Sequence, residues 1–403
     1  SYGFVTGNGV SNDDFTVQLE AGCAMHWRHG FYVYNNAGFD GVKSASKVAS
    51  IIRYEDSMAY IARNWVLPSF TLQVAPGNPA LTEVAPGVYF GYDDTTLIFP
   101  DAEMILTSYQ SDSITFLLAG DGDYIFLAKG SFLMPLVVSG LNNEIRGTGK
   151  ITGPIFLLNG SSKLLFDLQG QVQTNISLGG GTMCLVGDLA FSDGAICTGT
   201  GVIDIQENTL SLGAKDSVWT STLEWQGDNG TIVLNAGVDL LGTWTFIGTC
   251  IINGDGNALD LNNLGRMVIG SDATLILRNV YLKNIGDDSI TCVDDSAHLV
   301  LDNTVWIQGG DATFEFGSIT FLNEVEFIGS HTFAYESSQT STIATKSTWS
   351  IRDGITLKDG RSSPSGVTPL YFQDGSSILE IDNASLFVSD HGMQITNGML
   401  LFN

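Results

Sequence analysis

The stretch Leu275-Ile276-Leu277-Arg278-Asn279 decides the fold, because its pattern of apolar, any, apolar, any, Asn returns four more times downstream, once with Asp in the last position. Successive copies end 24, 20, 30 and 30 residues apart, and a short apolar segment follows each one. Short alternating strands at this kind of period are typical of a solenoid. The five copies end at Asn279, Asn303, Asn323, Asp353 and Asn383.

The repeat favours one class of solenoid over two others. Leucine-rich repeats would show a fixed LxxLxLxxN spacing with a helix after each strand, and neither feature is present. Helical repeats disagree with the dominance of strand-like segments and with 47 glycines in 403 residues. The sequence therefore predicts an all-β fold, a parallel β-helix (β-solenoid) in which each turn contributes two or three short strands.

The polar residue that ends each copy is predicted to lie at a sharp corner between strands. Asn and Asp tolerate the left-handed backbone region, and their side chains hydrogen-bond nearby backbone groups. Stacked along the axis, the five residues Asn279, Asn303, Asn323, Asp353 and Asn383 would form a structural ladder that needs no ligand.

The chain is expected to have three parts. Residues 1–20 form an N-terminal arm, residues 21–125 a small mixed cap region, and residues 126–403 the parallel β-helix. Within the cap region, the amphipathic spacing of apolar residues over 42–65 predicts a helix that covers the end of the solenoid.

Both ends of the chain are predicted to take part in assembly. The chain closes on a segment that resembles a core strand without a cap, and an uncovered apolar turn should gain a partner by strand addition. A second copy of the chain is the natural partner, and a contact that does not close on itself generates a fibre. The predicted interface residues are Phe15, Val17 and Leu19 of the arm, and Met399, Leu400, Leu401 and Phe402.

Charge narrows the list of other partners. The chain has 17 Lys and Arg against 43 Asp and Glu, for a net charge of −26. This charge argues against binding to nucleic acid or to an anionic membrane surface. No apolar stretch approaches the length of a transmembrane helix, so membrane insertion is not expected, and no signal peptide is recognised in the chain.

One short motif raises the question of catalysis. Gly286-Asp287-Asp288-Ser289-Ile290 resembles an element of polygalacturonase-like hydrolases, in which paired carboxylates protonate the glycosidic oxygen and activate water. The other motifs of those enzymes do not follow, so no catalytic residues are predicted. A polysaccharide hydrolase or lyase is kept as the less favoured alternative.

Metal ligands and cofactors are not predicted either. Cys23, His26 and His29 would share one face of a helix, but the residues that follow indicate a turn and a strand, and no fourth ligand is near. The five cysteines are expected to be small buried residues, with a Cys184–Cys197 disulfide as the alternative.

Residues 242–403 resemble the right-handed parallel β-helix repeats of bacterial surface and adhesin-type proteins. The uncharged Ser- and Thr-rich stretch Thr340–Trp349, interrupted by one lysine, is similar to repeats of exported bacterial proteins. The resemblance implies a structural role in an extracellular or cell-surface location. We therefore expect a non-enzymatic subunit of an extracellular fibre or surface assembly that associates with itself. The alternative is an adhesin that binds surface glycans, which exposed aromatic residues on one face would favour.

Overall fold

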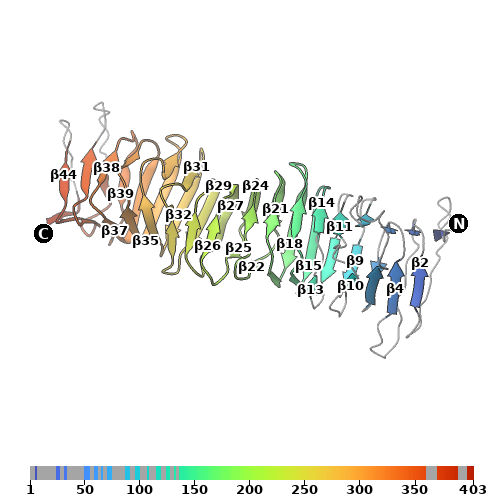
Figure 1. Ribbon diagram of the computed structural model, residues 1–403. Coiled ribbons are helices and arrows are strands. Elements are labelled where there is room, and N and C mark those ends of the chain that lie inside the picture. The colour runs from blue at the N-terminus through green and yellow to red at the C-terminus, as the bar shows by residue number, and fades with distance from the viewer. Residues whose placement is uncertain are drawn as a thin grey trace. The chain divides into compact units, whose positions relative to one another are not determined.

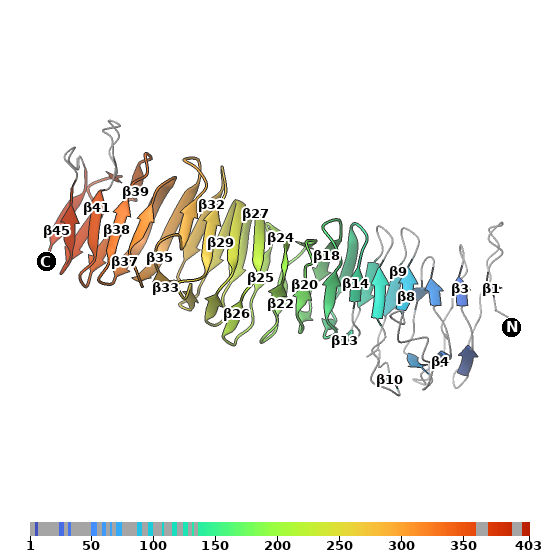
Figure 2. The ribbon, with the colours of Figure 1, turned by 45° about the horizontal axis from the view of Figure 1, so that its top comes forward.

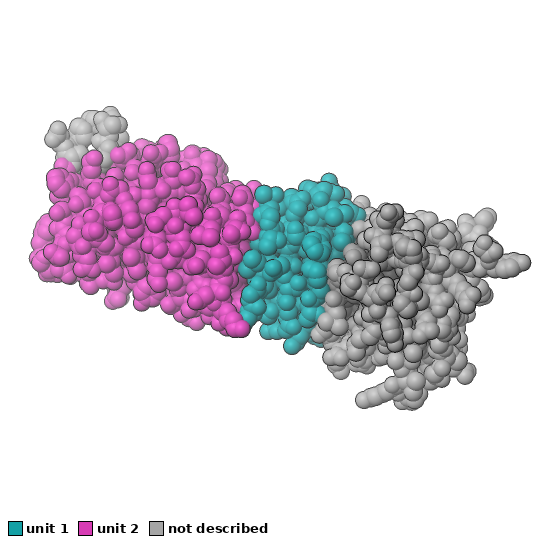
Figure 3. Space-filling model, viewed as in Figure 1, with its two compact units in different colours: residues 1–201 teal, residues 202–403 magenta. Residues whose placement is uncertain are grey.

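The computed structural model describes residues 136–359, 370–388 and 397–403 in full, and the backbone of short strands between Val5 and Phe132. The fold is all-β, with parallel strands stacked into a β-solenoid of about 12 turns (Figure 1). This confirms the predicted fold class, while the right-handed sense of the coil stays a prediction. Among the described residues there is no helix, and thus none that is long and apolar enough to cross a membrane. The chain divides into two compact units, residues 1–201 and 202–403, which we treat in turn (Figure 3).

In the first unit, the strands alternate between buried and accessible side chains because successive residues of a strand point to opposite faces. One column of paired residues runs from Leu136 through Ile155 and Ile176 to Cys197, and all four are fully buried. Apolar residues stacked in register thus build the core turn by turn. The strands concerned are β14 (Leu136–Val138), β15 (Asn143–Gly147), β16 (Lys150–Ile151), β17 (Ile155–Leu157), β18 (Lys163–Leu168), β19 (Gln171–Val172), β20 (Ile176–Ser177), β21 (Thr182–Leu185), β22 (Leu189–Phe191) and β23 (Cys197–Thr198).

The predicted helix over 42–65 is wrong, because three strands occupy part of that segment. They are β4 (Ser50–Tyr54), β5 (Ala59–Ile61) and β6 (Trp65–Val66). β4 pairs in parallel with strands on both sides, and so does β5. β-Branched and aromatic residues such as Ile51, Ile52 and Tyr60 favour strands, and pairing with two neighbours outweighs a helical spacing of apolar residues.

The predicted boundary at residue 126 is crossed by parallel pairing. β11 (Thr115–Leu118) pairs with β8 (Gly87–Phe90) on one side and with β14 on the other. β12 (Tyr124–Leu127) likewise joins β9 (Thr96–Phe99) to β15. The arm and the cap region otherwise lie largely outside the described residues. The remaining strands of this part are β1 (Val5–Thr6), β2 (Ala24–Trp27), β3 (Phe31–Val33), β7 (Phe70–Val74), β10 (Thr107–Ser108) and β13 (Ser131–Phe132).

In the first turns of the second unit, two strands, β27 and β29, are long enough to run along two faces of the coil. β27 pairs with β29 over eleven residue pairs, with an irregularity between Asp228 and Gly230 where the strand bends. These first strands are β24 (Thr200–Gln206), β25 (Thr209–Ser211), β26 (Ser217–Trp219), β27 (Thr222–Val233), β28 (Val238–Leu240), β29 (Thr243–Asn253), β30 (Ala258–Asp260), β31 (Arg266–Ile269) and β34 (Ile290–Cys292).

Later turns of the second unit have three faces, which we call A, B and C and which the pairing of their strands defines. β35 (His298–Gln308) and β37 (Ser318–Ile328) each contribute first to face A and then to face B. Face A also holds β32 (Thr274–Arg278), β39 (Ser341–Ile343) and β42 (Leu370–Phe372). Face B adds β33 (Tyr281–Ile285), β40 (Thr348–Arg352), β43 (Ile378–Asp382) and β45 (Met399–Phe402). Face C consists of β36 (Ala312–Phe314), β38 (Thr332–Tyr335), β41 (Thr356–Asp359) and β44 (Ser385–Phe387).

A column of inward-facing residues on face B forms the centre of this core. Paired residues follow one another from turn to turn as Leu282, Trp306, Phe327, Ile351 and Ile381, none more than 3% exposed. The rings of Trp306 and Phe327 stack with centroids 4.8 Å apart and planes inclined by 16°. This spacing matches the separation of neighbouring strands, so the backbone ladder itself brings the rings into contact.

We expect Phe327→Ala to lower the free energy of unfolding by about 3–5 kcal/mol, because it removes a fully buried ring and leaves a cavity between two turns. Tyr281→Ala, on the outer side of the same face and 43% exposed, is the matched control and should change stability by less than about 0.5 kcal/mol. Urea unfolding followed by tryptophan fluorescence measures both. Equal losses would contradict the assignment of inward and outward columns.

Candidate functional site

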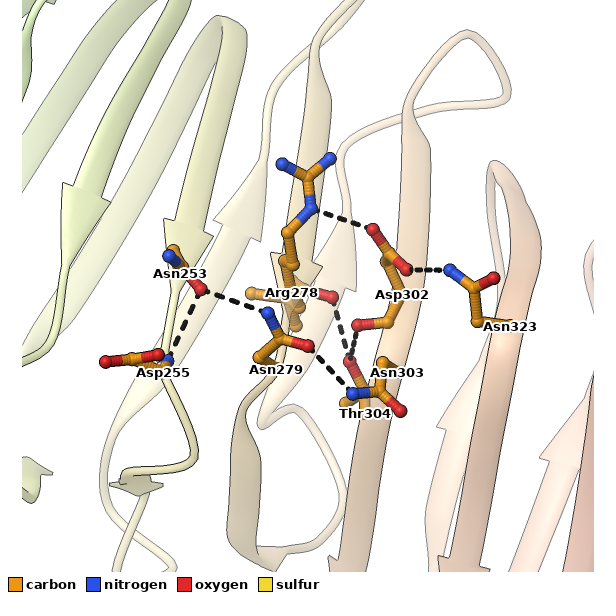
Figure 4. Close-up of polar contacts among 9 residues, drawn as sticks. Asn253, Asp255, Arg278, Asn279, Asp302, Asn303, Thr304 and Asn323 are labelled. Carbon is orange, nitrogen blue, oxygen red and sulfur yellow. Dashed lines mark hydrogen bonds and ion pairs between the residues drawn. The ribbon is translucent and has the colours of Figure 1, made fainter.

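The five predicted ladder residues all adopt the left-handed backbone region, with φ between 47° and 61°. Asn303 Nδ2 donates a hydrogen bond of 2.8 Å to Asn279 Oδ1, and Asn279 Nδ2 reaches Asn253 Oδ1 at 3.5 Å (Figure 4). Stacked amides therefore link three successive turns at the corner between faces A and B. Asn323 leaves this line, because its Nδ2 donates to Asp302 Oδ1 at 2.6 Å.

The remaining two ladder residues lie at a different corner. Trp349–Arg352 pairs with Val325–Ile328 of face B, whereas the alignment of the repeats would stack it on Ile319–Leu322 of face A. Asp353 and Asn383 consequently lie at the end of face B strands, whereas Asn279, Asn303 and Asn323 lie at the end of face A strands. The pattern of apolar, any, apolar, any, Asn marks the end of a strand at either corner, so it does not identify the face.

Replacing Asn303 with Val should lower the stability by roughly 1–2 kcal/mol, because a β-branched residue is strained at a φ of 52°. Asn303→Gly relieves that strain and loses only the amide ladder, so we expect it to lie closer to the parent chain in thermal unfolding. Both variants lose the amide ladder, so a glycine variant no more stable than the valine variant would contradict the assignment of strain to this corner.

The predicted interface segment Met399–Phe402 forms β45, which pairs in parallel with β43 and is the last strand of face B (Figure 2). Phe402 continues the inward column after Ile381, which is only 3% exposed, yet Phe402 is 66% exposed. Met399 and Leu401, on the other side of the strand, are 44% and 40% exposed. The apolar core thus reaches the surface at this end. Phe15, Val17 and Leu19 lie outside the described residues.

A groove of about 640 Å³ runs over face B of the second unit. Its central column is formed by outward residues that pair from turn to turn: Tyr281, Val305, Glu326, Ser350 and Glu380. Asn279 and Asn303, the ladder amides, form part of its rim together with Asp255 and Glu324.

Arg352 organises one end of this groove. Its Nη1 lies 2.7 Å from Glu326 Oε1, and its Nη2 lies 3.2 Å from Glu380 Oε2. Ser350 Oγ donates a 2.8 Å hydrogen bond to Glu380, and Asn403 Nδ2 donates one of 2.6 Å. The Ser350 hydroxyl, followed by Arg352, lowers the pKa of Glu380 below its ordinary value of 4.5. These ion pairs and hydrogen bonds connect three successive turns with one another and with Asn403.

Acid should destabilise the second unit through this cluster. Because its folded-state pKa is depressed, Glu380 contributes stability that is complete above pH about 4.5 and is lost as pH falls through the lowered value. Serine hydrogen bonds lower the pKa of Asp294 and Asp374 in the same direction. We expect Glu380→Gln to unfold at lower temperature than the parent near neutral pH and to lose less of its stability on acidification. Thermal unfolding across the acid range tests this, and parallel acid profiles for the two proteins would contradict it.

The two carboxylates of the Gly286–Ile290 motif and the half-buried His298 do not line the groove. Asp287 and Asp288 lie in the turn between β33 and β34, where Asp288 has a φ of 59° and approaches Arg266 at 3.7 Å. His298 contacts Ser318 Oγ at 2.7 Å and Thr320 Oγ1 at 3.1 Å through its two ring nitrogens. Both contacts go to hydroxyls of the next turn, so His298 links β35 to β37, whereas a catalytic triad would place a carboxylate at one nitrogen.

The four cysteines among the described residues belong to the core. Cys184, Cys197, Cys250 and Cys292 are at most 8% exposed, as expected for small buried residues. Burial raises the pKa of Cys250 and of Cys292 to about 12, which keeps both thiols protonated and poorly nucleophilic. Within the part of the chain that the structure describes, no group of three or more His, Cys, Asp or Glu residues could hold a metal ion.

Sequence reasoning identified the end strand but missed the groove. The central column of the groove takes one residue from each of five turns, and only the register of the strands brings these residues together. The one available signal was the polar character of outward positions in 324–326 and 348–352. No family model, curated protein or solved structure matches this chain.

Proposed function

We propose that this chain is a structural subunit of an extracellular or cell-surface assembly that associates with itself through the exposed apolar strand β45. The observation that carries the proposal is Phe402, a member of the inward column that is nevertheless 66% exposed. Inward residues of earlier turns are shielded by the next turn. A further turn of the same kind would shield Phe402 in the same way.

The chemistry of the end supports a solenoid as the partner. The side chains of β45 are entirely apolar, in a protein whose net charge is −26. Like charge keeps copies of such a protein apart except where uncharged surfaces meet. A parallel strand placed against β45 would extend the ladder by about 4.8 Å and bury the exposed apolar groups. In the first unit, β1 is the terminal strand in the order of the nine-stranded sheet and is the candidate partner strand.

Self-association should depend on the apolar residues of β45. We expect the parent chain to form larger species as its concentration rises, and the double variant Leu400→Asp, Phe402→Asp to stay monomeric in sedimentation velocity. Leu264→Asp is the matched control, because Leu264 is 68% exposed in a turn between β30 and β31, away from β45. A parent chain that stays monomeric at every concentration, or a control that dissociates equally, would refute the proposal.

A further inference from the structure

The groove on face B has a regular construction that the self-association proposal does not use. Its central column contributes one side chain from each turn, from Tyr281 through Val305, Glu326 and Ser350 to Glu380. Neighbouring turns lie about 4.8 Å apart, so contacts of a similar kind recur at a fixed interval. We propose that this groove binds a linear oligosaccharide that carries amino groups, with the sugar chain lying along the stack of turns.

Charge in the groove selects the class of sugar. Four carboxylates, those of Asp255, Glu324, Glu326 and Glu380, face a single cation, Arg352. Arg352 is held between Glu326 and Glu380. Asp255 and Glu324 are both exposed and form no ion pair with any described residue. An anionic polysaccharide would be repelled, whereas ammonium groups would supply the missing counter-charges.

Tyr281 gives the groove an aromatic surface at the end opposite Arg352. Its side chain is 43% exposed and is the one aromatic residue of the described groove lining. An exposed ring of this kind packs against the apolar face of a sugar and attracts an adjacent ammonium group. The hydroxyl and amide groups of Thr348 and Asn303 add hydrogen-bonding partners along the same surface.

A basic peptide would also neutralise the acidic side chains of the groove, but the backbone geometry favours a sugar. Peptides bound in extended form gain much of their affinity from main-chain hydrogen bonds at the open edge of a sheet. The groove lies on the face of a sheet whose strands β33, β35, β37, β40 and β43 already pair with one another. Only side chains are available there, and side-chain donors and acceptors suit the hydroxyl and amino groups of a saccharide.

Calorimetric titration of the Leu400→Asp, Phe402→Asp chain, which separates binding from self-association, tests the assignment. The probe is a glucosamine hexamer at pH about 6, where its amino groups carry positive charge. We expect binding that weakens at least about tenfold, or about 1.4 kcal/mol, in Tyr281→Ala and in Glu324→Gln. The matched controls lie outside the groove: Tyr371→Ala, also 43% exposed, and Glu336→Gln should bind as the parent does.

Three comparison ligands sharpen the result. The N-acetylglucosamine hexamer, which lacks the charge, should bind more weakly, and the galacturonic acid hexamer should not bind. Hexalysine should bind more weakly than the glucosamine hexamer and be insensitive to Tyr281→Ala. The proposal is overturned if the glucosamine hexamer does not bind, if its binding is unaffected by the groove variants, if the acidic or acetylated hexamer binds as tightly, or if hexalysine matches it in affinity and in sensitivity to the variants.

Discussion

The in-register pairing of parallel strands between successive turns is the constraint on which the rest of this structure depends. Once Leu282 pairs with Trp306 and Trp306 with Phe327, every inward residue meets an inward residue of the next turn. A shift of one residue would place the whole apolar set on the outer side. The apolar columns of the core, the stacked amides and the outward column of the groove all follow from the same register.

The same constraint makes the ends of a solenoid different from its middle. Each interior turn shields the core of its neighbour, whereas most of the apolar side chains of β45 are exposed. Ile381 and Phe402 occupy equivalent positions in consecutive turns, and their exposed fractions are 3% and 66%. Burial of that surface is the driving force in the assembly that we propose, and the strongly acidic composition restricts where contact can occur.

The sequence was sufficient to predict the fold class, because alternation of apolar residues and a period of 20 to 30 residues are local properties. The helix over 42–65 failed for a physical reason: apolar residues such as Ile51 and Ile52 satisfy both a helical and a strand pattern, and pairing between turns decides the outcome. The ladder was divided between two corners because Asn323 and Asp353 end strands on different faces. Local pattern marks a corner without saying which one.

The groove was beyond sequence reasoning for a related reason. Arg352 meets Glu380, 28 residues away, only because a turn of 30 residues brings β43 onto β40 with Ser350 opposite Glu380. Turn lengths vary along this chain, so the partner of an outward residue depends on loops whose length carries no periodic signal. The apolar core can be predicted without knowing the turn lengths, because almost any inward neighbour is apolar. A polar site depends on particular neighbours and therefore cannot.

Cryo-electron microscopy of the assembled chain tests the central claim most directly. The account predicts filaments or oligomers in which the strand spacing of about 4.8 Å continues across the junction between subunits, with β45 of one copy paired to a strand of the next and Phe402 buried. A junction formed by the sides of the solenoid, with β45 still exposed to solvent, would contradict it.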